Sequence, residues 1–228
     1  MSPSGTPQAL RELHGPRYRW WLLLSVMIGT MASIMSSTVV NVAIPDMSHQ
    51  FTLGQDRAQW VSSAFMLAST SAMLTTPWLL ARFGYRRTYI HATLALMVGG
   101  IAGGVSDVFW GVLAARIAEG LAAGVMQPIP AIIILRAFEP AEQGRASSFF
   151  SMGVVLAPAI GPSVGGVLVD AFGWRSIFFM VIPFCIASLY MARRYVPLTG
   201  PGGVGAPLPA ALDWRGLLLV SGGSMCLL

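Results

Sequence analysis

The sequence contains no lysine, and only nine of its 228 residues are acidic. Without a lysine, the chain has no Walker-type phosphate loop, so ATP hydrolysis within it is excluded. Charged residues make up 10% of the chain, against about 25% in an average soluble domain. This scarcity excludes an ordinary soluble domain and a disordered chain. It also argues against nucleic acid as a partner, because no basic face is expected.

Cysteine and histidine are also scarce, with two and three residues. The two cysteines, Cys185 and Cys226, lie inside apolar runs, and we interpret them as small buried hydrophobic residues. The sequence has no zinc spacing, no disulfide framework and no plausible catalytic set. It therefore predicts a protein that is not an enzyme and that binds no cofactor or metal.

What the sequence has in abundance is long apolar runs, and hydrophobic residues make up 55% of it. A helix needs about 20 apolar residues to cross the hydrocarbon core of a membrane. The sequence therefore predicts an all-α, polytopic membrane protein. We place its spans at about 20–44, 60–80, 89–105, 109–135, 146–169, 176–191 and 214–228.

The predicted organisation has four parts. Residues 1–19 form an N-terminal tail, and residues 20–196 form a bundle of six transmembrane helices. Residues 197–212 are rich in proline and glycine, which is typical of a linker. Residues 213–228 begin a seventh helix that is too short to cross the membrane. From this we expect a truncated seventh helix, and hence a fragment or a truncated product.

The arginines predict the orientation of the spans. Eleven lie in the N-terminal tail and in alternate loops, two lie in the remaining loops, and one lies inside the fourth span. By the positive-inside rule, the N-terminus and the arginine-rich loops are cytoplasmic.

The fourth span contains an ionisable pair at membrane depth. Arg116 and Glu119 are three positions apart, so they share one helix face, and Gln127 returns to nearly the same face about three turns after Arg116. Because ionisable groups inside a membrane are costly, they face a partner or an aqueous cavity. The three residues either line a substrate or proton pathway, or the charged pair only ties this span to a neighbour.

The first span carries Thr38 and Asn41 on one face. An asparagine inside a membrane helix needs hydrogen bonds. It either lines a polar cavity or bonds to a neighbouring helix.

The fifth span combines small residues with prolines. Gly153, Ala157, Gly161 and Gly165 recur every four residues and predict a groove where another helix approaches closely. Proline removes a helix hydrogen bond and favours a kink. We favour a pivot here over plain close packing, built from Gly153, Pro158, Gly161, Pro162, Gly165 and Gly166.

The loop between spans two and three contains Arg82, Gly84, Arg86 and Arg87. Gly84 allows the sharp turn between the spans. The arginines either anchor the loop to anionic headgroups, or pair with helix C-termini or acids and lock one conformation.

Taken together, these segments resemble the fourteen-helix drug:proton antiporters of the major facilitator superfamily. Residues 37–45 resemble the signature of the first helix, and residues 79–87 resemble the loop motif. Residues 116–120, followed by Pro128, resemble the motif of the fourth helix. Residues 161–166 resemble the antiporter motif of the fifth helix, and residues 173–179 resemble the start of the sixth.

The resemblance implies the N-terminal portion of a proton-coupled multidrug efflux transporter in a bacterial inner membrane. It implies alternating access between two six-helix bundles, with the substrate bound at the midplane. Expected partners are small hydrophobic or cationic substrates, protons, the lipid bilayer, the missing C-terminal bundle and a periplasmic adaptor protein. The alternatives are a metabolite or siderophore exporter on the same scaffold, or a membrane fragment that does not transport. Without its second bundle, this chain is not expected to transport by itself.

The sequence departs from the family pattern at three motifs. Ser36 stands where the first-helix signature usually has aspartate, and Glu119 stands where the fourth-helix motif usually has glutamine. In the loop motif, Ala81 stands where the family usually has an acid, and Pro77 stands where it often has glycine. We hypothesise that Glu119 partly takes over the role of the acid missing at Ser36.

Overall fold

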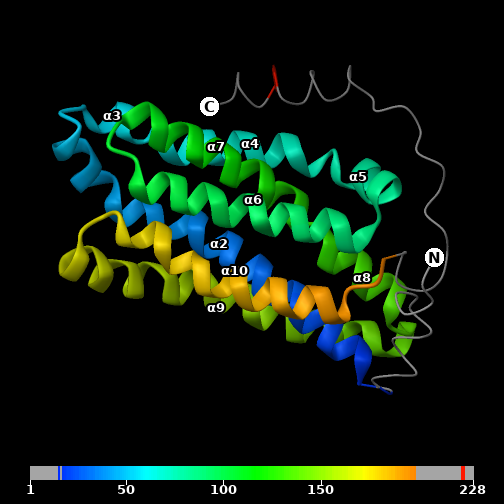
Figure 1. Ribbon diagram of the computed structural model, residues 1–228. Coiled ribbons are helices and arrows are strands. Elements are labelled where there is room, and N and C mark those ends of the chain that lie inside the picture. Colours follow the sequence, from blue (N-terminus) through cyan, green and yellow to red (C-terminus); the bar gives the residue numbers. More distant parts are fainter. Residues whose placement is uncertain (1–14, 16, 199–221, 224–228) are drawn as a thin grey trace.

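The computed structural model describes residue 15, residues 17–198 and residues 222 and 223. Within this part of the chain every regular element is a helix, and the helices pack side by side in one bundle (Figure 1). The helices are α2 (Tyr18–Gln50), α3 (Gln55–Ala58), α4 (Trp60–Met73), α5 (Thr76–Phe83), α6 (Tyr85–Val105), α7 (Phe109–Met126), α8 (Ile129–Ala137), α9 (Pro140–Phe172) and α10 (Ser176–Tyr195). Most of the predicted tail, linker and seventh helix lies outside the described residues.

The membrane-spanning pattern agrees with the predicted fold class. Five helical stretches are long and apolar enough to cross a membrane, with α7 and α8 counted as one of them. A sixth is obtained if the bent pair 55–73 and 76–83 forms a single span. The helix edges are wider than predicted, because α2 continues through Pro45 to Gln50 and α9 begins at Pro140.

Prolines set the two breaks that the sequence reading missed. The second span bends by 55° after Met73, and Pro77 lies four residues later. The fourth span is interrupted after Met126, and Pro130 again lies four residues later. A proline ring clashes with the carbonyl four residues before it and donates no hydrogen bond to that carbonyl. Each helix therefore ends at the residue whose carbonyl the proline would block.

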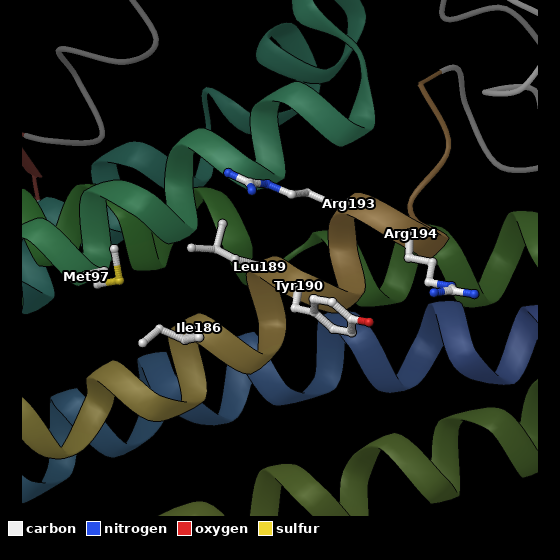
Figure 2. Close-up of a pocket in the computed structure, with 6 residues that line it drawn as sticks. All are labelled: Met97, Ile186, Leu189, Tyr190, Arg193 and Arg194. Atoms are coloured by element: carbon white, nitrogen blue, oxygen red, sulfur yellow. The ribbon is translucent and has the colours of Figure 1, made fainter.

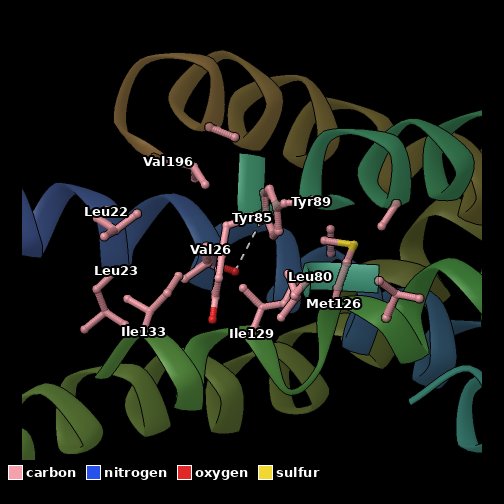
Figure 3. Close-up of a cluster of buried hydrophobic side chains, with 14 of the residues drawn as sticks. Leu22, Leu23, Val26, Leu80, Tyr85, Tyr89, Met126, Ile129, Ile133 and Val196 are labelled. Carbon is pink, nitrogen blue, oxygen red and sulfur yellow. Dashed lines mark hydrogen bonds between the residues drawn. The ribbon is translucent and has the colours of Figure 1, made fainter. Parts of the chain in front are cut away.

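Helix α2 is the central element of the bundle. It contacts α4, α7, α8, α9 and α10, and it runs through the bundle behind α10 (Figure 1). Near its N-terminal end it contributes Leu22, Leu23 and Val26 to a buried apolar cluster. Figure 3 shows these side chains beside Tyr89 of α6 and Ile133 of α8. Burial of this cluster joins the N-terminal end of α2 to the neighbouring helices.

The predicted small-residue groove of α9 packs directly against α2. Gly153 lies against Met27, while Gly161 and Gly165 lie against Val39. Helix α9 continues without a break through both of its internal prolines, Pro158 and Pro162. The groove is therefore confirmed as a site of close helix packing, and the pivot remains a prediction.

Gly84 occupies the turn between α5 and α6, as predicted. Its φ of 81° and ψ of 167° are strained for any residue with a side chain. Gly173, between α9 and α10, has nearly the same angles, 80° and 167°. Both glycines follow a phenylalanine and precede an aromatic residue and an arginine. A glycine with a positive φ thus lets the chain reverse its direction at both turns.

Helices α4 and α7 approach each other through glycines. A methyl group at Gly124 would collide with the backbone of Ser69, and one at Gly120 with the backbone of Phe65. Because the obstacle is backbone, no side-chain rotation can relieve the collision. The spacing of α4 and α7, which positions the ion pair described below, depends on these two glycines.

We expect the Gly124→Ala variant to lose about 1–3 kcal/mol of unfolding free energy through overpacking. Gly144→Ala is the matched control, because a methyl group there meets nothing within 4 Å. The control variant should be neutral, or more stable by up to about 1 kcal/mol, since alanine favours helix. Thermal unfolding of the detergent-solubilised protein measures both. Equal stability of the two variants would contradict the packing described for α4 and α7.

Candidate functional site

The ion pair of α7 lies in the interior of the bundle. Nη1 of Arg116 is 2.5 Å from Oε2 of Glu119, and the two side chains are 1% and 0% exposed. Glu119 points toward α6, where its Cγ and Oε1 lie next to Gly99 and Gly100. The missing side chains at these glycines leave room for the carboxylate between α6 and α7.

Ser36 of α2 completes this arrangement. Nη1 of Arg116 donates a hydrogen bond of 2.7 Å to the Ser36 hydroxyl, which itself donates one of 3.3 Å to Oε2 of Glu119. Helix α4 contributes the ring of Phe65, 4.2 Å from the guanidinium carbon, and the carbonyl of Val61, 3.5 Å from Nε. A cation over an aromatic face is stabilised by the ring quadrupole. The pair therefore connects α2, α4 and α7 and lies against α6.

Two polar atoms of this buried pair have no hydrogen-bond partner among the described residues. They are Nη2 of Arg116 and Oε1 of Glu119. An unsatisfied buried polar group costs about 1–3 kcal/mol. The pair therefore retains the capacity to bind a proton, a water molecule or a polar group in addition to the contacts already formed.

Thr38 and Asn41 lie on a more open face of α2 than Ser36. Asn41 is exposed, and its Oδ1 accepts a hydrogen bond of 2.7 Å from Ser62 of α4. Asn41 also lines a hollow of about 420 Å³ whose walls include Gln55, Gln59 and Ser63. Both alternatives considered for Asn41 hold, because it lines a polar hollow and bonds to a neighbouring helix. Thr38 donates to the Ile34 carbonyl at 3.0 Å.

Gln127 does not join the ion pair. It is exposed at the C-terminal end of α7, whereas Arg116 and Glu119 are buried. Gln127 directly follows the last residue of α7 and keeps helical angles, φ −58° and ψ −45°, so its predicted face is retained, but about 12 Å of helical rise separates it from Glu119. The predicted pathway residues therefore form two groups, one buried and one open, and their joint role in transport remains a prediction.

The arginines of the loop between spans two and three make no ion pair within the described residues. Arg82 instead lies over two aromatic rings, 5.4 Å from the centroid of Trp78 and 5.9 Å from that of Phe83. Arg86 is half-buried and Arg87 is exposed. Both roles considered for these arginines remain open.

Sequence reasoning missed three members of the site. The sequence marks Ser36 only as a departure from a family pattern, and it gives no signal for Phe65 or Ser62. Nothing in their local sequence distinguishes them from other serine and phenylalanine residues in an apolar helix. In the part of the chain that the structure describes, no three His, Cys, Asp or Glu residues are grouped to hold a metal ion.

Three relatives of this chain are named as resistance or export proteins. The chain is 31% identical to the tetracenomycin C resistance and export protein of Streptomyces glaucescens, covering 99% of this chain and 41% of that protein. It is 29% identical to a multidrug resistance protein B homolog of Mycobacterium tuberculosis, covering 98% and 41% of the two chains. It is also 29% identical to the multidrug export protein EmrB of Haemophilus influenzae, covering 90% and 40%. The chain thus spans about two fifths of these relatives.

Solved structures share the fold. A crystal structure of the peptide transporter POT in complex with sulfate superimposes with a TM-score of 0.70 at 18% identity, covering 98% of this chain and 47% of that one. The proton:xylose symporter XylE superimposes with a TM-score of 0.69 at 13% identity, covering 93% and 50%. The six predicted spans are thus arranged as in one half of such transporters.

The sequence pattern of the family described as Major Facilitator Superfamily matches residues 26–227. With that match, the relatives and the shared fold, the chain belongs to the major facilitator superfamily of membrane transporters.

Proposed function

We propose that this chain forms the N-terminal bundle of a proton-coupled efflux transporter with several drug substrates. The proposal rests on its family membership and on relatives named as multidrug resistance and export proteins. Because the chain spans about two fifths of those relatives, the transport cycle belongs to a protein that also supplies a second bundle. Substrate binds between the two bundles, and their rocking exposes it to alternate sides of the membrane.

The observation that carries the proton-coupling part of the proposal is the buried pair with its unused carboxyl oxygen. Protonation of Glu119 removes the negative charge and leaves Arg116 as an unpaired cation in the bundle interior. An uncompensated buried charge costs about 3–5 kcal/mol. The protonated state therefore favours a conformation in which Arg116 reaches water or another acceptor. In this way proton binding and release drive the conformational change.

The position of Ser36 supports the hypothesis that Glu119 partly takes over the role of a missing acid. The Ser36 hydroxyl, at the position where the resembled family usually has aspartate, lies 3.3 Å from Oε2 of Glu119. The carboxylate therefore occupies the neighbourhood that an aspartate at position 36 would reach. We propose that the acid moved from α2 to α7 while its place in the bundle was retained.

The open face of α2 and α4 supports a substrate-binding role. The hollow beside Asn41 and Ser62 offers amide and hydroxyl groups. On the same helix α4, Met66 and Met73 are 53% and 44% exposed. Flexible thioether side chains adapt to ligands of different shape. We propose that this face, together with the second bundle, contacts small hydrophobic or cationic substrates.

The arginine distribution supports the proposed orientation in the membrane. The N-terminus and the end of the bundle that carries Arg82, Arg86 and Arg87 are assigned to the cytoplasm. The opposite end, where Arg175 pairs with Asp107 at 2.9 Å, is assigned to the outside. The proposed location is the inner membrane of a bacterium, with the N-terminus inside the cell.

One relative favours a second candidate function. The Streptomyces glaucescens protein, 31% identical to this chain, is named for resistance to and export of one compound, tetracenomycin C. A transporter of this kind would export a single metabolite through the same cycle. A substrate profile separates the candidates, because multidrug efflux predicts protection against chemically unrelated compounds and the alternative predicts protection against one class.

We expect Glu119→Gln to lower the unfolding free energy by about 3–5 kcal/mol, since it leaves Arg116 unpaired. Adding Ser36→Asp to this variant should restore most of the loss, because position 36 lies within hydrogen-bond reach of Arg116. Denaturation of the purified protein in detergent tests this expectation. Failure of the second substitution to recover stability would show that an acid at position 36 cannot replace Glu119.

The transport proposal predicts a matching pattern in the full-length protein. In proteoliposomes with an imposed pH gradient, Glu119→Gln should reduce proton-driven drug transport at least about tenfold. Exchange of drug for drug, which moves no proton, should continue, and Ser36→Asp should recover part of the proton-driven transport.

Asp107→Asn is the control, because Asp107 is an exposed acid at the end of the bundle, 91% exposed. This variant should transport drug in response to the imposed pH gradient as the unmodified protein does. If Glu119→Gln also kept its transport driven by the pH gradient, Glu119 would not be the proton carrier.

A further inference from the structure

A hollow of about 680 Å³ lies between α6 and α10, on a different part of the bundle from the face of Asn41. Met97 of α6 and five residues of α10 line it, as Figure 2 shows. The five are Ile186, Leu189, Tyr190, Arg193 and Arg194. None of these residues belongs to the ion pair or to the proposed substrate face.

The hollow is chemically divided along the helix axis. Met97, Ile186 and Leu189 form an apolar part, and Arg193 and Arg194 follow toward the C-terminal end of α10. Ile186 and Arg193 are seven residues apart, which is two helical turns or about 10 Å. Tyr190 stands between the two parts, where an apolar ring with a polar tip fits. An apolar groove that ends in positive charge matches a molecule with a hydrocarbon chain and an anionic head.

The two arginines are available to such a head. Both are exposed, and within the described part of the chain neither forms an ion pair. By contrast, Arg19, Arg116 and Arg175 each have a carboxylate partner. Figure 2 shows the Arg193 side chain extending over the hollow from the end of α10, while the exposed Arg194 side chain points the other way and reaches a headgroup by rotating.

We propose that this hollow is a binding site for one anionic phospholipid. The phosphate is held by Arg193 and Arg194, and one acyl chain lies along Met97, Ile186 and Leu189. Basic pockets between transmembrane helices on the cytoplasmic side bind anionic lipid headgroups, and arginine presents its donors in a fork that suits phosphate. A cationic drug is not the expected occupant, because the lining has two positive charges and no acid.

The test measures lipid retention without any transport. The full chain is purified in detergent with equal amounts of phosphatidylglycerol and phosphatidylcholine, and native mass spectrometry counts the lipids that remain bound. We expect one phosphatidylglycerol to be retained in preference to phosphatidylcholine. The double variant Arg193→Gln, Arg194→Gln should weaken that binding about thirtyfold, from the loss of two arginine–headgroup attractions.

Two further variants separate a defined site from general attraction to positive charge. Arg136→Gln with Arg145→Gln removes the same charge from the same end of the bundle, outside the hollow, and should retain the lipid. Ile186→Trp fills the apolar part while leaving both arginines, and it should reduce retention. The Ile186 side chain is 55% exposed, so the larger ring does not disturb the core.

Three results would overturn the proposal. Equal losses in the two arginine double variants would show unspecific attraction. Full retention by Ile186→Trp would show that no acyl chain enters the hollow. Efficient cross-linking of an Ile186→Cys variant to a chain segment beyond residue 198, with no lipid bound, would show that the protein itself covers this surface.

Discussion

A guanidinium group that is 1% exposed inside an apolar bundle must have its charge balanced, and this requirement organises the structure around Arg116. Glu119 supplies the opposite charge from the next turn of the same helix, and Ser36 bonds to both. Phe65 lies beneath the cation, and the glycines of α6 leave space for the carboxylate. Four helices therefore meet at one neutral cluster whose charges cannot be separated without large cost. A proton bound by the Glu119 carboxylate would therefore change the net charge of this cluster directly.

Small residues and prolines determine how the helices reach this cluster. Gly120 and Gly124 bring the backbones of α4 and α7 together, and this contact places Phe65 beside Arg116. Helices α4 and α7 each end four residues before a proline, Pro77 and Pro130 respectively. The second and fourth spans are therefore both broken toward the arginine-rich end of the bundle. The ion pair lies beyond these breaks, in regular helix held by close packing. The cluster around Arg116 therefore requires both a balanced charge and the close approach of the α4 and α7 backbones.

Much of this fold could be predicted from the sequence, because apolar runs and the arginine pattern are physical requirements of a membrane span. The turn at Gly84 was predictable because its positive φ favours glycine, and the packing groove at Gly161 was predictable because small residues recur every four positions. The exposure of Gln127 was not, because it depends on how neighbouring helices pack around the end of α7. The role of Ser36 was hidden as well, since a serine shows its partner only after α2 and α7 are placed together.

Replacing the whole pair by apolar residues tests the central claim most directly. A buried ion pair exchanged for hydrophobic residues of similar size leaves stability unchanged or raises it by about 1–4 kcal/mol. The account predicts that the full-length variant Arg116→Met, Glu119→Leu folds with at least the stability of the unmodified protein, yet moves no proton with its substrate, as measured by a pH-sensitive dye inside proteoliposomes. Proton movement coupled to substrate at the unmodified rate in this variant would contradict the account.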